Sequence, residues 1–260
     1  MHFSIRRAIA ALTPGEDAQR HYDLAAQRLQ QALLTVAVPT IPGLQIGVRA
    51  EPARLVGGDY VDLLATPEGH LIFGLGDASG KSLAAALNAM MVRYLVRGLV
   101  AALGPRELAK IVEHANTVIS DDVTEGSFVT FLIGVLDPGS GLLRIVNAGH
   151  EPPLILRERD ACVTSISRHG LVLGIDRSST FQEDSVILER GDLVAVYTDG
   201  LTEATNERGE LYTMECLADA FIERRSLAPQ EIADSLFDTV KRYSVGGLRD
   251  DATILVLRLV

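Results

Sequence analysis

The chain has 260 residues, of which 47% are hydrophobic and 22% are charged, and this length and composition allow a sizeable buried core. The formal net charge is -10. A surface of this sign repels the phosphate backbone of nucleic acids, so we expect no nucleic-acid partner. The two cysteines, Cys162 and Cys216, lie in no CxxC or Cys/His spacing. They therefore make no disulfide framework or zinc site by themselves, and a reducing, cytoplasmic location is favoured.

Residues 17–36 have the hydrophobic spacing of an amphipathic helix, which Pro39 and Pro42 end because proline cannot continue a helix. The apolar positions recur at alternating steps of three and four and so share one stripe: Tyr22, Ala25, Leu29, Ala32 and Val36. The stripe either packs on its own domain or forms a homodimer contact or a signalling linker. We expect residues 1–40 to be a helical linker, dimerisation or regulatory segment, and residues 41–260 to be one folded domain.

The order of the later elements predicts antiparallel sheets covered by helix pairs. Strict alternation of strands and helices is missing, which argues against a doubly wound parallel sheet. The predicted strands are residues 44–51, 71–75, 128–136, 142–146, 154–157, 185–189, 193–197 and 252–259. The predicted helices are residues 82–102, 106–120, 214–224 and 229–243.

One run, residues 83–103, is long and apolar enough to be mistaken for a membrane span. It contains Asn88, Arg93 and Arg97, and each arginine would cost about 2.5–3.5 kcal/mol at the centre of a bilayer. The N-terminus lacks the long apolar stretch and the cleavage site of a signal peptide. We therefore expect a buried helix here and no membrane span.

Four short segments carry aspartates beside glycine or other small residues, each where a predicted strand begins or ends. They are residues 57–62 (GGDYVD), 76–81 (GDASGK), 198–203 (TDGLTE) and 250–253 (DDAT). Each alone is typical of a turn. If the strand ends bring them together, however, the carboxylates repel one another unless a cation neutralises them. Oxygen ligands suit hard divalent cations, so the pattern predicts a magnesium or manganese site.

Together with residues 147–153 (NAGHEPP), these segments over residues 44–260 resemble the SpoIIE/RsbU-type branch of the metal-dependent serine/threonine protein phosphatases, relatives of the 2C class. The branch has the same five motifs in the same order. The resemblance implies an α+β fold, a four-layer αββα sandwich of two antiparallel sheets flanked by helix pairs. This agrees with the order of elements predicted above.

The resemblance also implies a metal centre with two Mn²⁺ or Mg²⁺ ions. Asp77 would bridge both ions, and the backbone carbonyl of Ala78 would bind one of them. Asp199 and Asp250 would bind the other ion. In two-metal catalysis of this type, an activated water attacks the phosphorus in line, so no protein nucleophile is needed.

Other residues are candidates for secondary roles in the site. Asp59 and Asp62 occupy the first motif, where the resemblance implies acidic residues that hold metal-bound water or a third ion. Asp251 is interpreted as a neighbour of the ligands. Arg49 and Arg54 precede the first motif and are candidates for binding the substrate phosphate, although exposed arginines are common.

The chain departs from the 2C class at Ser79, where that class has a histidine that protonates the leaving group. The proton must then come from solvent or elsewhere, so we expect slow turnover on generic substrates. His150 lies in a turn marked by Gly149, and we favour a structural role for it over a catalytic one. The role of Lys81 stays open, while Ser82 is predicted to cap the following helix.

The resemblance thus predicts a phosphatase that acts on phosphoserine or phosphothreonine in a protein. It further suggests an anti-sigma-factor antagonist as the substrate, in a bacterial partner-switching pathway. The alternative is a non-catalytic or strongly regulated switch or scaffold that uses the same fold to bind a partner.

Overall fold

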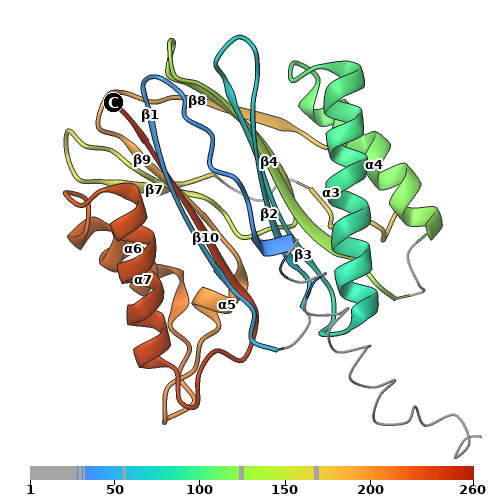
Figure 1. Cartoon of the computed structure of the whole chain (residues 1–260). Helices are drawn as coiled ribbons and strands as arrows, with labels where there is room; N and C mark the ends of the chain where they lie inside the picture. Colours follow the sequence, from blue (N-terminus) through green and yellow to red (C-terminus); the bar gives the residue numbers. More distant parts are fainter. Residues whose placement is uncertain (1–27, 29–30, 32, 55–56, 123–125, 167–169) are drawn as a thin grey trace, which may run out of the picture.

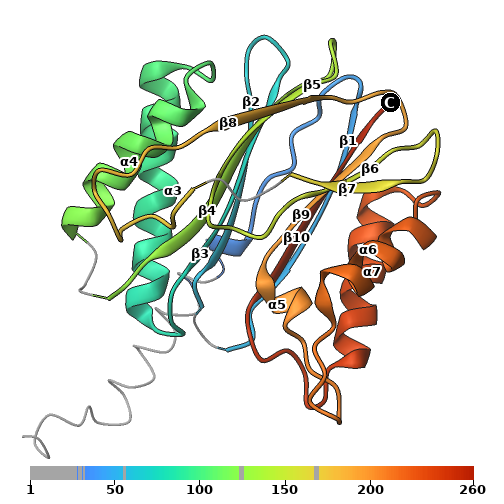
Figure 2. The ribbon, with the colours of Figure 1, turned by 180° about the vertical axis from the view of Figure 1, so that it is seen from behind.

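The computed structural model describes residues 28, 31, 33–54, 57–122, 126–166 and 170–260. Two five-stranded antiparallel sheets pack face to face, and a helix pair covers the outer face of each sheet (Figure 1). The view from behind shows the same four layers (Figure 2). The predicted αββα sandwich is therefore confirmed.

The first sheet has the strand order β2-β3-β4-β5-β8. Its strands are β2 (Asp59–Ala65), β3 (Leu71–Ala78), β4 (Val129–Asp137), β5 (Leu142–Ala148) and β8 (Glu183–Ile187). The helices α3 (Leu83–Leu103) and α4 (Leu108–Asp122) cover its outer face. The inner strand β3 is buried on both faces, which explains why its sequence is a continuous apolar run.

The second sheet has the order β1-β10-β9-β6-β7. Its strands are β1 (Leu44–Glu51), β10 (Ala252–Leu259), β9 (Leu193–Tyr197), β6 (Leu154–Leu156) and β7 (Val163–Ser165). The helices on its outer face are α6 (Thr213–Glu223) and α7 (Pro229–Tyr243), and the short α5 (Asp199–Thr202) follows β9 directly. The side-chain amide of Gln230 on α7 pairs with the backbone of β1, accepting from the N–H of Val48 at 3.0 Å and donating to its carbonyl at 3.1 Å.

Three apolar clusters hold the layers together. The central cluster lies between the sheets and includes Leu75 of β3 and Leu255 of β10, both fully buried. The outer clusters join each sheet to its own helices, for example through Ile111 of α4 and Phe237 of α7. Burial of this apolar surface is the main force that stabilises the sandwich.

Helix α3 begins as predicted, because the Ser82 hydroxyl accepts a hydrogen bond from the N–H of Ala85 at 3.4 Å. By length and composition alone, α3 is the one helix among the described residues that could cross a membrane. One face of α3 packs on β2, β3 and α4, with Ala89 fully buried. The other face leaves Leu87 and Tyr94 exposed, so the predicted burial holds for one side of the helix only.

The predicted helix over residues 17–36 lies mostly outside the described residues. The described positions 28, 31, 33 and 34 are helical, and the helix has ended by Thr35. Leu33 is fully buried in the cluster formed with α3 and α4, and its carbonyl accepts from Arg93 at 3.4 Å. This part of the segment therefore packs on its own domain, while the homodimer contact stays a prediction, as does a domain boundary near residue 40.

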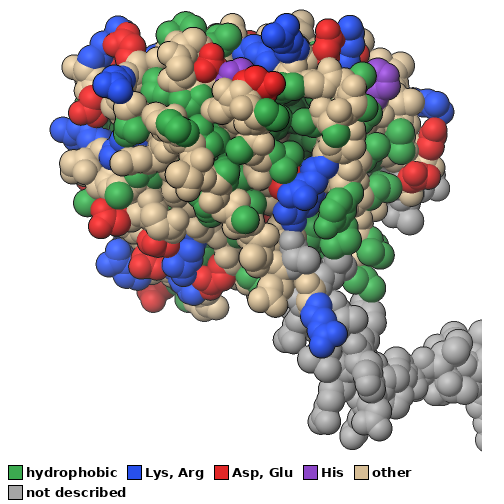
Figure 3. All heavy atoms as spheres, turned by 45° about the horizontal axis from the view of Figure 1, so that its top comes forward, with side chains coloured by type: hydrophobic (Ala, Val, Ile, Leu, Met, Phe, Trp, Pro, Cys, Tyr) green, Lys and Arg blue, Asp and Glu red, His purple; other side chains and the backbone are tan. Residues whose placement is uncertain are grey.

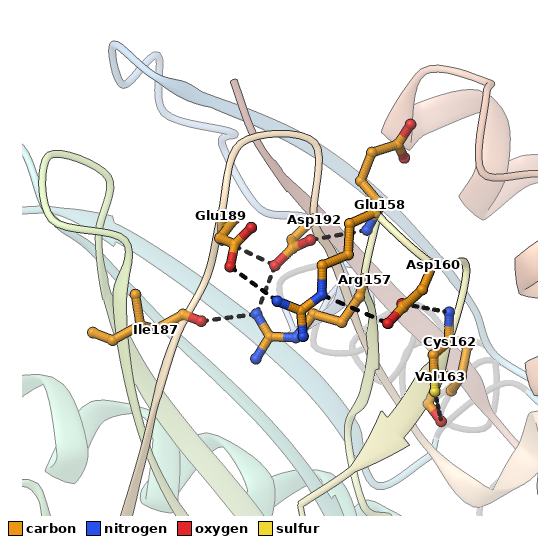
Figure 4. A network of polar contacts seen from close by, with 9 residues as sticks. Arg157, Glu158, Asp160, Cys162, Val163, Ile187, Glu189 and Asp192 are labelled. Atoms are coloured by element: carbon orange, nitrogen blue, oxygen red, sulfur yellow. Dashed lines mark hydrogen bonds and ion pairs between the residues drawn. The ribbon is translucent and has the colours of Figure 1, made fainter.

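A polar network joins the two sheets at the end of the sandwich where strands β6 and β8 end (Figure 4). Arg157, just after β6, donates to Asp192 Oδ2 at 2.6 Å and to the carbonyl of Ile187 on β8 at 2.8 Å. Asp192 is buried and also accepts from the backbone N–H groups of Glu158 and Glu189, both at 2.9 Å. Figure 3 looks at this end of the molecule, where acidic and basic side chains are interspersed.

Candidate active site

The three predicted catalytic aspartates come from both sheets. Asp77 lies near the end of β3 in the first sheet, and the structure extends this strand to Ala78, past the predicted end. Asp199 is the first residue of α5, directly after β9, and Asp250 lies just before β10. These strand ends meet on the side of the sandwich where α5 lies (Figure 1), so the topology brings together carboxylates far apart in sequence.

Burial and mutual repulsion raise the pKa values of two of these carboxylates. Burial, followed by the charges of Asp199 and Asp250, raises the pKa of Asp77 to about 7. Burial, followed by the charges of Glu203 and Asp250, raises the pKa of Asp199 to about 6. The aspartates therefore lie close enough to repel one another, and the nearby positive charge does not balance their negative charge.

Asp59 joins these aspartates from β2, where it lies opposite Asp77 in the strand register. Its carboxylate is 1% exposed, and Oδ2 accepts from the hydroxyls of Thr198 and Thr253, both at 2.8 Å. Burial and the charge of Asp77 raise the pKa of Asp59 well above its ordinary value. Because Thr253 lies in β10 and Thr198 directly follows β9, these bonds also fix one sheet against the other next to the site.

The structure does not bring Asp62 to this cluster. Side chains alternate between the faces of a strand, so Asp62 points to the side opposite Asp59, toward α3. Its carboxylate receives hydrogen bonds from Arg97 Nε at 2.6 Å and Arg97 Nη2 at 2.5 Å, and Arg93 Nη2 lies at 3.4 Å. Since two arginines already balance its charge, we leave Asp62 out of the proposed metal site.

Asp251 supports the loop that leads into β2. Its Oδ1 accepts from the N–H of Ala53 at 2.9 Å. A Cβ atom on Gly57 would lie 1.3 Å from Asp251 Oδ2, and one on Gly58 would lie 2.1 Å from the carbonyl oxygen of Ala78. The two glycines of the first motif therefore let the loop backbone approach the candidate ligands closely.

Of the two candidate phosphate-binding arginines, Arg49 is bonded to residues other than the site aspartates. Arg49 donates to Asp234 on α7 at 3.1 Å and to Glu51 at 3.4 Å, and its guanidinium lies 5.1 Å from the centre of the Phe237 ring. Arg54 is exposed, and its role in binding phosphate stays a prediction.

The cation at the cluster is Lys81, whose role the sequence left open. Its Nζ lies 2.7 Å from Asp250 Oδ2 and donates to the carbonyl of Arg249, also at 2.7 Å. Lys81 also lowers the pKa values of Asp77 and Asp199. Its position two residues before α3 was visible in the sequence, but its pairing with a distant loop was not.

His150 and Ser79 have structural partners. His150 is 1% exposed, its Nδ1 lies 2.8 Å from Thr130 Oγ1, and its backbone N–H donates to Asn147 Oδ1 at 2.8 Å. Thr130 pairs with Asp77 across β4 and β3, so this turn supports the strand that carries Asp77. The Ser79 hydroxyl accepts from the N–H of Phe128 at 3.0 Å.

The oxygen donors of the cluster suit a divalent cation, although their side chains do not all point at one common position where an ion could bind. Among the described residues, no group of three or more His, Cys, Asp or Glu side chains is already arranged as a metal site. The cluster offers only oxygen donors, and the raised pKa values of Asp77 and Asp199 indicate uncompensated negative charge. Hard cations such as Mg²⁺ and Mn²⁺ prefer such donors and would relieve the repulsion.

The chain has the fold of PP2C-type phosphatase domains. It is similar to the SiaA-PP2C domain of Pseudomonas aeruginosa, with a TM-score of 0.77, 19% identity and all of both chains covered. It is also similar to the RsbU and RsbW domains of a Mycobacterium tuberculosis protein, with a TM-score of 0.74 and 28% identity over 88% of this chain and 63% of that chain.

Within this class, the sequence model described as Stage II sporulation protein E (SpoIIE) matches residues 67–260, and the chain belongs to this family. It is 28% identical to the phosphoserine phosphatase RsbU of Bacillus subtilis over 234 residues, covering 90% of this chain and 68% of that protein. It is likewise 28% identical to protein IcfG of Synechocystis over 257 residues, covering 89% of this chain but only 40% of that protein.

Proposed function

We propose that this chain is a metal-dependent phosphatase that removes phosphate from phosphoserine or phosphothreonine in a protein. The observation that carries the proposal is the convergence of Asp77, Asp199 and Asp250 from two sheets in one negative field. Membership of the SpoIIE family supports the same assignment.

In this proposal Asp77, the Ala78 carbonyl, Asp199 and Asp250 would together hold two Mn²⁺ or Mg²⁺ ions. When bound, the ions would activate a water and offset negative charge on the phosphoryl oxygens. Two manganese ions are present in the structure of the phosphatase PstP, which has the same fold with a TM-score of 0.62 and 18% identity. A third ion near Asp59 is a further element of the proposal.

The residues of the chain that surround the ligands would position them. The hydroxyls of Thr198 and Thr253 orient Asp59, and the backbone of Gly58 lies against the carbonyl of Ala78. Ser79 uses its hydroxyl to accept a bond from Phe128 and is a poor source of the proton that the leaving alkoxide needs. Solvent would then supply the proton, at the cost of slow turnover.

We further propose that the substrate is a phosphorylated anti-sigma-factor antagonist in a bacterial partner-switching pathway. The support is the likeness to RsbU, which is named a phosphoserine phosphatase. In a Mycobacterium tuberculosis protein an RsbU domain also occurs in one structure with an RsbW domain.

The test is hydrolysis of p-nitrophenyl phosphate with and without Mn²⁺, followed by a phosphorylated antagonist protein as substrate. Asp199→Asn and Asp77→Asn should abolish manganese-dependent turnover because each removes a ligand charge. Asp121→Asn is the matched control, since Asp121 pairs with Arg177 on the exposed surface of α4. Full activity in Asp77→Asn would refute the proposed role of Asp77.

A second candidate function is a non-catalytic switch or scaffold that binds a partner. Two observations favour it. Asp250 is already paired with Lys81, and the described side chains of the cluster are not arranged as a metal site. Calorimetry decides between the two functions: failure to bind Mn²⁺ at millimolar concentration would favour the scaffold.

A further inference from the structure

Lys81 connects the two halves of the candidate site. It lies in the turn between β3 and α3, directly after Gly80, whose φ of 96° is accessible to glycine at little cost. Its ammonium reaches the loop before β10, where it bonds Asp250 Oδ2 and the Arg249 carbonyl, both at 2.7 Å. The lysine therefore links the turn that follows Asp77 to the loop that carries Asp250.

This ion pair is built from a partly buried lysine. The side chains of Lys81 and Asp250 are 30% and 39% exposed, so solvent screens the pair but does not remove it. Two of the three donor positions of the ammonium are used by fixed acceptors on the same loop. Lys81 therefore contacts this loop at two points, a carboxylate and a backbone carbonyl.

We propose that Lys81 is an internal counter-ion that holds Asp250 in the metal-free protein and that a divalent cation must displace from this carboxylate. The inference rests on the proposed function, because it takes Asp250 as a metal ligand. An ammonium in contact with Asp250 would lie within a few ångströms of any cation bound there, and the two positive charges would repel each other. Metal binding and the Lys81–Asp250 contact therefore compete with each other.

A cavity beside the ion pair could accommodate the Lys81 ammonium after its displacement from Asp250. This cavity has a volume of about 260 Å³, and its lining includes Lys81, Arg249, Asp250 and Glu203. The four-carbon stem of lysine is flexible enough to move within this space. Glu203 then provides a second carboxylate at the cavity wall.

The counter-ion has opposite effects on the two states. In the metal-free protein it reduces repulsion among the aspartates and so stabilises the fold. In the metal-bound protein it no longer has Asp250 as a partner and adds positive charge near the cation. Lys81 therefore lowers the affinity for metal relative to the same site with a neutral residue.

The experiment measures Mn²⁺ affinity by calorimetry and thermal unfolding in a chelator, on the full chain. Lys81→Met should bind Mn²⁺ about tenfold more tightly, a change of about 1.4 kcal/mol, and should unfold at a lower temperature when metal-free. Lys81→Arg keeps the charge and should stay close to wild type in both measurements. Arg249→Gln, which removes a positive charge from the same cavity but keeps the ion pair, should change the affinity by no more than about twofold.

The outcomes separate this inference from the proposed function. If wild type binds Mn²⁺ and Asp250→Asn does not, the metal site is supported, and Lys81→Met then tests the counter-ion alone. Equal or weaker binding by Lys81→Met would overturn the counter-ion role while leaving the phosphatase assignment intact. If wild type binds no Mn²⁺, both proposals fail.

Discussion

The buried aspartates differ in what balances their charge. Asp62 faces two arginines, and Asp59 accepts hydrogen bonds from two threonine hydroxyls. Asp77 and Asp199 face mainly other carboxylates, with Lys81 as the cation that lowers their pKa values. The uncompensated negative charge that a cation would neutralise is therefore concentrated at Asp77 and Asp199.

The raised pKa values of Asp77 and Asp199 make the stability of the metal-free protein depend on pH. Because the pKa of Asp77 is raised to about 7 and that of Asp199 to about 6, the folded state binds protons that the unfolded state has released. Stability from these groups is then present at low pH and is lost as pH rises through the raised pKa values.

In a chelator, we expect the metal-free protein to lose the stability that these two groups contribute between about pH 4, near their ordinary pKa, and about pH 7. Urea denaturation at each pH measures the change, and Asp77→Asn should flatten the dependence. Saturating Mn²⁺ should reverse its sign, because metal binds the deprotonated carboxylates. A pH dependence unchanged in Asp77→Asn would contradict the assignment of the raised pKa to this residue.

The sequence predicted that Asp77, Asp199 and Asp250 lie near one another, because each adjoins an apolar strand and strand ends can bring distant carboxylates together. It could not show the partners of Lys81 or Arg49, since a long cationic side chain selects its partner by tertiary packing. Lys81 pairs with Asp250, and Arg49 pairs with Asp234 on α7. Both partners are distant in the chain.

At the level of elements, β2 and α3 are joined by a buried ion pair. The side chain of Asp62 is 10% exposed and that of Arg93 is 8% exposed, while Arg97 completes the cluster. Taking such charges out of water is costly, so removing one partner leaves the others poorly compensated. The cluster therefore fixes the position of α3 on the strand that also carries Asp59.

Asp62→Asn should destabilise the protein by about 3 kcal/mol, because two arginines would then face an uncharged amide at a largely buried position. Its Mn²⁺ affinity should stay near wild type, since Asp62 lies on the face of β2 opposite Asp59. Urea denaturation and calorimetry measure the two effects.

The control for this variant is Asp121→Asn, which breaks an exposed pair with Arg177 and should cost no more than about 1 kcal/mol. The contrary result, in which Asp62→Asn keeps its stability but loses Mn²⁺ binding, would return Asp62 to the metal site.

Most elements were predictable from hydrophobic periodicity. The bounds of β1, β9, β10 and α7 coincide with the predicted residue ranges. The strand β2 was missed because its first motif, with two glycines and two aspartates, has the composition of a turn. Only its pairing with β3 and the arginines of α3 make these residues a buried strand, and neither partner can be read from the local sequence. The elements β7 and α5 were missed because each has too few residues to show a hydrophobic periodicity.

For the whole molecule, the main consequence of the topology is that the site is divided between the two sheets. Asp77 and Asp59 belong to the first sheet, whereas Asp199 and Asp250 adjoin strands of the second. A cation bound by both groups would act as a link across the centre of the sandwich. Its binding energy would then contribute to the stability of the whole fold, because the unfolded chain has no such site.

We expect Mn²⁺ at about 100 times its dissociation constant to stabilise the protein by about 2.7 kcal/mol. For a chain of this size that corresponds to a rise in Tm of about 5–10 °C. Differential scanning calorimetry with Mn²⁺ and with a chelator measures the shift. Asp199→Asn should lose most of it, and an equal shift in that variant would argue against binding at this site.

The contact between Gln230 and β1 has a consequence for assembly. β1 is an outer strand of its sheet, and such a strand exposes backbone groups on which a strand from another chain can add. The Gln230 amide occupies both backbone groups of Val48, as a neighbouring strand would, and α7 covers that side of the sheet. This edge is therefore a poor template for strand addition, so chains of this protein should resist joining into a continuous sheet through β1.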